Sequence, residues 1–172
     1  MRGFLTFTAG LLTAFIPQLA QAQEDAQSSV GPAYPRDSVL GAADAFFEAL
    51  ASADKTALAD VMIREATIFV HNRMELGNPR IDIVPVADHL ARWARGTRNV
   101  SEKMVYERVY ENGDLGIVEG PYCFSVEGEV THCGVNILNI VKTDEGWKVG
   151  NTSFTMVPPD MCDIVGANWV GQ

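Results

Sequence analysis

The chain has 172 residues, and its thirteen Lys and Arg face twenty-two Asp and Glu, which gives a net charge of −9. This length suits one globular domain with its own core. The basic residues are scattered along an acidic chain, which argues against nucleic-acid binding, because that function needs clustered cations.

The N-terminal segment has the three parts of a secretory signal peptide. Arg2 provides the charge, residues 4–19 form an apolar run, and Ala20-Gln21-Ala22 provides the small residues of a cleavage site. The apolar run is shorter than the roughly 20 residues that a membrane-spanning helix needs. We therefore expect residues 1–22 to be removed, leaving a periplasmic or secreted protein with no membrane contact.

Helical periodicity dominates the first half of the remaining chain. After a flexible leader at residues 23–37, rich in Gln, Ser, Gly and Pro, apolar residues recur at three-to-four spacing from Ser38 to Leu50, as in a helix with one buried stripe. A short second helix is expected around Leu58, and a third over residues 84–94.

Strand-like composition follows the helices. One strand is predicted over residues 66–70, and Asn72 to Pro79 reads as a loop. Four further runs, separated by hairpin turns, are expected at residues 104–110, 115–126, 130–141 and 147–157. Helices placed ahead of an antiparallel sheet indicate an α+β domain over residues 38–157, followed by an irregular tail over residues 158–172.

Two stretches resemble a known superfamily. Ala45-Phe46-Phe47-Glu48-Ala49-Leu50, with Asp54 and Ala66-Thr67 after it, is similar to the opening of SnoaL-like and ketosteroid-isomerase-like domains. The ending Gly146-Trp147-Lys148-Val149 is similar to theirs. The chain thus resembles the nuclear transport factor two-like superfamily. This resemblance implies a cone-shaped fold, in which a curved antiparallel sheet wraps against three N-terminal helices around an apolar pocket, but it implies no single function.

The resemblance also suggests where catalytic groups belong. In ketosteroid isomerase a carboxylate base works with a Tyr and a protonated acid. The Tyr position falls at Phe46 here, the base at Val70 or His71, and the second acid at Asn136. Phe46 has no hydrogen-bond donor, so that specific mechanism is not expected. His71 is instead a candidate base, with Asn136 and Tyr122 as candidate groups to stabilise negative charge.

Several roles stay open at this stage. The first is binding of a small apolar molecule, with ligand contacts expected from Phe47, Trp93, Tyr106 and His132. The second is an isomerase or a dehydratase-like lyase using His71, and the third is a structural module with a filled core. The apolar residues on both faces of residues 135–141 predict a homodimer. No cofactor motif and no metal-ligand spacing is present, so neither is expected.

Three cysteines remain, and an exported protein would keep one disulfide and one spare thiol. A three-residue loop at Glu127 to Glu129 would place Cys123 opposite Cys133, whereas a two-residue loop would take them out of register. In the second case a bridge from Cys162 would pin the tail to the sheet. A bridge involving Cys162 is the favoured prediction.

Overall fold

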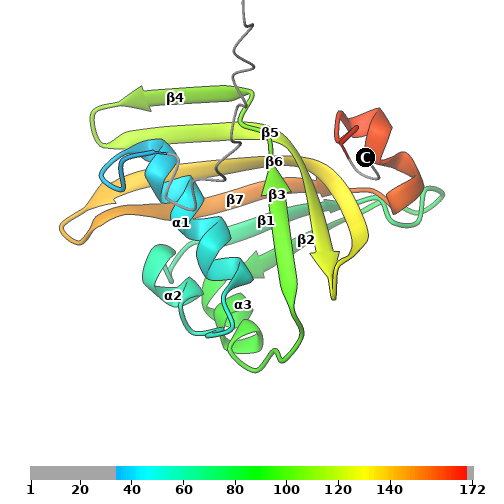
Figure 1. Ribbon diagram of the computed structural model, residues 1–172, viewed down its shortest axis with the longest axis horizontal. Helices are drawn as coiled ribbons and strands as arrows, with labels where there is room; N and C mark the ends of the chain where they lie inside the picture. Colours follow the sequence, from blue (N-terminus) through cyan, green and yellow to red (C-terminus); the bar gives the residue numbers. More distant parts are fainter. Residues whose placement is uncertain (1–33, 170–172) are drawn as a thin grey trace, which may run out of the picture. The chain divides into compact units, whose positions relative to one another are not determined.

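The computed structural model describes residues 34–169. The predicted signal peptide, most of the leader and the last three residues of the chain lie outside this range. Seven strands form one mixed sheet in the order β2-β1-β7-β6-β5-β3, with β4 also paired to β5. In Figure 1, helix α1 crosses one face of the sheet, away from the C-terminal η1 segment. Among the described residues, no helix has the length and apolar character needed to cross a membrane.

The helices follow the predicted order. They are α1 (Val39–Ala51), α2 (Leu58–Val61) and α3 (Val86–Trp93). The Ser38 side chain caps α1 by accepting a hydrogen bond from the Gly41 amide, which satisfies one of the N–H groups left open at a helix start. The apolar stripe of α1 is buried against the sheet, with Phe46 and Leu50 in the core.

The strands differ from the prediction at two places. The structure contains β1 (Thr67–Asn72), β2 (Arg80–Pro85), β3 (Val100–Met104), β4 (Arg108–Asn112), β5 (Leu115–Val126), β6 (Glu129–Thr143) and β7 (Gly146–Met156). The predicted run at residues 104–110 is divided between β3 and β4 by residues 105–107, where the Val105 and Glu107 amides still donate to the Pro121 and Glu119 carbonyls of β5. The α+β class is confirmed. The sheet is mixed and not purely antiparallel, since β1 runs parallel to β7.

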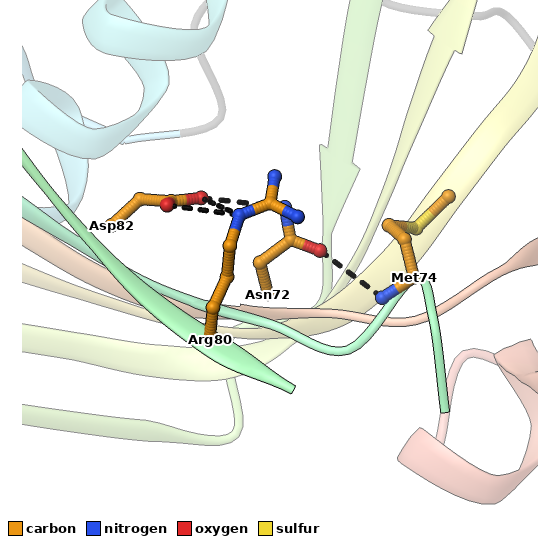
Figure 2. A network of polar contacts seen from close by, with 4 residues as sticks. All are labelled: Asn72, Met74, Arg80 and Asp82. Carbon is orange, nitrogen blue, oxygen red and sulfur yellow. Dashed lines mark hydrogen bonds and ion pairs between the residues drawn. The ribbon is translucent and has the colours of Figure 1, made fainter. Parts of the chain in front are cut away.

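Strand β2 was missed because its pattern is reversed: its exposed residues are apolar, whereas Arg80 and Asp82 on the inward face are charged. Ile81 and Ile83 are exposed, which hides the alternation that identifies a half-buried strand. A polar network joins β2 to β1 (Figure 2): Asn72 donates to Asp82, and Asp82 also pairs with Arg80 at 3.0 Å. The side-chain oxygen Oδ1 of Asn72 accepts a hydrogen bond from the Met74 backbone amide at 3.1 Å, and this bond helps to shape the turn.

The β5–β6 hairpin decides the position of the cysteines. Its loop has two residues, Glu127 and Gly128, both with positive φ, as a tight hairpin turn requires. The predicted loss of register does not follow, because β6 has a bulge opposite Phe124 and Ser125. Thr131 is the extra residue of this bulge, and it shifts the pairing by one position. Cys123 therefore faces Cys133.

The C-terminal tail is more ordered than predicted. It forms the 3₁₀ segment η1 (Pro159–Val165), which ends at Gly166 with positive φ. Cys162 is buried in a small apolar cluster with Cys123, Cys133, Val157 and Ala167. This cluster, separate from the main core, fastens the tail to β6 and gives the tail a defined position.

Candidate functional site

A cavity of about 220 Å³ lies between the inner face of the sheet and the helices. Its wall is mainly apolar, with Phe46 and Leu50 from α1, Ile68 and Val70 from β1, and Phe154 from β7 among its members. Successive strand residues point to opposite faces, so each strand contributes every second side chain. This volume is below the range of roughly 300 Å³ and upward that is typical of drug-sized ligands, so the cavity suits a small molecule.

The polar part of the wall centres on Glu102 of β3. The Glu102 carboxylate accepts a hydrogen bond from Asn136 Nδ2 at 3.0 Å, and burial raises the pKa of this carboxyl to about 7, although the Asn136 bond opposes the rise. The carbonyl oxygen of Asn136 is buried without a partner. Because an unpaired buried acceptor is costly, Asn136 is a ready contact for a ligand donor.

Tyr122 and His132 lie beside this pair. The Tyr122 hydroxyl donates to the Thr155 carbonyl at 2.9 Å, and burial raises its pKa, with the charge of Glu102 adding to the effect. The His132 ring stacks on Phe124 at 5.0 Å between centroids, and burial lowers its pKa to about 4. At neutral pH, His132 is therefore an uncharged imidazole, and Tyr122 is a protonated phenol already committed to the backbone.

Helix α3 closes one end of the cavity. Trp93 stacks on His89 and meets Phe124 edge-on, and its indole Nε1 is buried without a partner. His89 has a lowered pKa, first because it is buried and second because Arg92 is near. The wall of the cavity thus carries one unsatisfied donor, on Trp93, and one unsatisfied acceptor, on Asn136.

The predicted site residues fall into two groups. Asn136, Tyr122, Trp93 and His132 all line the cavity. Phe47 and Tyr106 do not; with Trp169 they line a separate depression beyond Glu102. The Tyr106 hydroxyl donates to Asp44 at 2.7 Å, and its ring stacks on Phe47, so both side chains join α1 to the sheet.

The placement of His71 at the pocket is wrong. Its neighbours Val70 and Asn72 are buried on the inner face, whereas His71 is exposed on the outer face, beside Phe69 and Ile81 in a shallow depression. The carboxyl group that lines the cavity is that of Glu102, which sequence reasoning missed because the strand was taken to begin at Met104. The period-two series Val100, Glu102, Met104 is the signal that identifies it.

The three cysteines form the one group of possible metal ligands found among residues 34–169, with their sulfur atoms all within 4.8 Å. The structure joins Cys133 to both Cys123 and Cys162, at Cα–Cα distances of 4.2 and 5.2 Å. A sulfur atom shares only one disulfide, so Cys133 pairs with one neighbour and leaves the other as a thiol. A disulfide removes two of the three ligands, so a metal would need the reduced protein.

No protein-family model and no curated protein matches the sequence. Solved structures do match. An NTF2-like protein from Cytophaga hutchinsonii has a TM-score of 0.55 at 16% identity, over 72% of this chain and 98% of that one. An NTF-2 like protein of unknown function from Shewanella oneidensis has 0.54 at 14%, over 71% and 99%.

The chain has the NTF2-like fold. A third match is the beta subunit of a putative aromatic-ring-hydroxylating dioxygenase from Novosphingobium aromaticivorans, with a TM-score of 0.53 at 12% identity, over 68% of this chain and 85% of that one. Identities this low establish the NTF2-like architecture only, since one fold supports many functions. The role of the cavity therefore has to be argued from its own residues.

Proposed function

We propose that this exported NTF2-like protein binds a small, mostly apolar molecule in the cavity. The observation that carries the proposal is the pairing of an apolar wall with two buried polar atoms that lack partners, Asn136 Oδ1 and Trp93 Nε1. Such a site favours a ligand that fills the apolar space and also carries a donor for Asn136 and an acceptor for Trp93.

A matched pair of substitutions tests this binding. Val84 lines the cavity from β2, whereas its neighbour Ile83 is exposed on the outer face. Val84→Phe places a ring in the cavity, and Ile83→Phe places the same ring outside it. Native mass spectrometry of the protein exported by its own host should show a bound small mass in the wild type and in Ile83→Phe, and none in Val84→Phe. Equal occupancy in both variants would contradict the proposal.

A second candidate is proton transfer, as in an isomerase or lyase. Glu102 favours it, because a carboxyl group with a pKa of about 7 can both accept and return a proton near neutral pH. In this mechanism Glu102 takes a proton from a carbon next to a carbonyl group, the electron pair moves to the carbonyl oxygen, and Asn136 donates to that oxygen. Glu102 replaces His71 as the base.

Deuterium exchange separates the two candidates once the ligand is known. An enzyme should exchange a ligand C–H for deuterium in D₂O, and Glu102→Gln should abolish that exchange while leaving binding within a fewfold of wild type. A ligand that binds without any exchange would support the binding function alone.

We also propose that the outer face of the sheet forms a homodimer. Phe69, Ile81 and Ile83 are 43%, 68% and 64% exposed and lie on adjacent strands β1 and β2. A contiguous apolar surface of this kind usually finds a partner. Sedimentation at micromolar concentration should give a dimer that Ile83→Glu converts to a monomer, and a monomeric wild type would exclude it.

A further inference from the structure

A basic depression of about 470 Å³ adjoins the cavity and shares three wall residues with it: His89, Arg92 and Trp93. Its other charged members are Lys55, from the turn before α2, and Arg95 and Arg98, from the turn after α3. Four full positive charges therefore meet at one mouth of the cavity, and no acidic residue lines the depression. In a chain with a net charge of −9, this clustering is a local reversal of sign.

These four cations are not neutralised by the protein. None of them takes part in an ion pair within residues 34–169. Two carboxylates beside these cations in the chain bind other groups: Asp54, next to Lys55, accepts from Thr56, and Glu127 accepts from Asn99, next to Arg98. Lys55 Nζ lies over the Trp93 ring at 5.6 Å from its centroid. The depression therefore has the positive charge needed to attract an anion.

Trp93 connects the depression to the cavity. Its ring contributes to both walls, and its buried Nε1 has no acceptor. A carboxylate at this boundary would accept from the indole N–H while the guanidinium groups around it supply charge-assisted hydrogen bonds. Glu102 lines the cavity but not the depression, and its own carboxyl group repels a second carboxylate, so the charged end of a ligand belongs in the depression.

We infer that the ligand is a small amphipathic carboxylate, with its apolar body in the cavity and its anionic head in the basic depression. This inference rests on the proposed binding function and names the class of molecule. It also assigns an orientation, in which the end far from the carboxylate lies toward Glu102 and Asn136.

Three eight-carbon probes with different head groups test the charge requirement: octanoate, octan-1-ol and octylamine. Calorimetric titration of the full mature protein at pH 8 and low salt should show octanoate binding at least about tenfold more tightly than octan-1-ol, and octylamine most weakly. Added salt should weaken octanoate binding and leave octan-1-ol binding in place, because salt screens exposed charges. Octan-1-ol binding as tightly as octanoate would overturn the inference.

A charge-matched pair of variants locates the head group. The double substitution Arg95→Gln with Arg98→Gln removes two exposed cations from the depression and should weaken octanoate binding about fivefold without changing octan-1-ol binding. The control is Arg64→Gln with Arg73→Gln, which removes two exposed arginines that line neither hollow. Equal octanoate affinity in both double variants would overturn the inference.

Val84→Phe distinguishes this failure from failure of the proposed function. If octan-1-ol binds and Val84→Phe prevents it, the cavity function stands, whatever the head-group result. If octanoate binding depends on Arg95 and Arg98 but is unchanged by Val84→Phe, the anion is held without the cavity, and the proposed function is wrong. If no probe binds, both proposals are contradicted.

Discussion

The two faces of the sheet carry the same kinds of residue in very different settings. The inner face holds Glu102 and His132 in a mainly apolar cavity. Burial raises the pKa of Glu102 and lowers that of His132, and both shifts favour the neutral form. The outer face holds the exposed His71 and the buried cysteine cluster. A shift of one residue along a strand moves a side chain to the other face of the sheet. The face that a residue occupies therefore decides its burial and its pKa as much as its residue type does.

Loss of the central cysteine should have the largest effect, and it acts on the outer face. Cys133→Ser removes the sulfur that both possible disulfides share. Loss of a native disulfide costs about 3 kcal/mol of unfolding free energy. Urea denaturation measures the loss, and hydrogen exchange should show the η1 segment unprotected. Cys123→Ser is the control, because it leaves the Cys133–Cys162 bridge. Equal losses in the two variants would show that the bridge to Cys162 does not hold the tail.

Substitution of the buried carboxyl should change stability in the opposite direction. The pKa of Glu102 rises from 4.5 to about 7 on folding, so the folded state retains a proton that the unfolded chain releases, and stability is lost as pH rises through this window. Glu102→Gln should therefore stabilise the protein at pH 8 by up to about 3 kcal/mol and leave it nearly unchanged at pH 4. Urea denaturation at the two pH values measures this. A stabilisation that did not depend on pH would place its cause elsewhere.

The smallest of the three effects compares the two histidines directly. The pKa of His132 falls from 6.5 to about 4 on folding, so the wild type loses stability as pH falls through that window. His132→Asn loses its packing on Phe124 at every pH, but that deficit should shrink by about 2 kcal/mol between pH 8 and pH 4.5. The exposed control His71→Asn should stay within about 0.5 kcal/mol of wild type at both pH values. If the stability deficit of His132→Asn were the same at both pH values, the His132 ring would take up a proton inside the cavity as readily as in the unfolded chain.

Much of the fold could be predicted from local pattern. The stripe of α1, the turn residues of the late hairpins and the alternation of β5 to β7 each follow from physics within about ten residues, and they predicted the α+β class. Strand β2 escaped because its exposed face is apolar and its inward face carries two charged residues. The parallel pairing of β1 with β7 joins residues some eighty positions apart along the chain. Pairing over such a distance leaves no local trace in sequence.

The site was predicted less well for the same reason. Asn136, Tyr122, Trp93 and His132 lie in or near long, regular elements whose face can be counted. Glu102 and His71 lie in short strands, where an error of one or two residues at the boundary changes the face. Three of the four cations of the basic depression, Arg92, Arg95 and Arg98, lie within seven residues of sequence. The sequence does not show that they share one hollow with Lys55, because only the packing of α3 beside the turn before α2 brings Lys55 to them.

The bulge at Thr131 allows the tip of the β5–β6 hairpin to change in length without shifting the pairs beyond the bulge. On one side of it lies a two-residue turn, and on the other lie the pairs Phe124 with His132 and Cys123 with Cys133. Deletion of Thr131 would straighten the strand and leave each of these pairs as it is. Insertions and deletions toward the tip can thus be absorbed before they reach the cavity or the cysteines, and this hairpin is a suitable place to graft a tag or reporter.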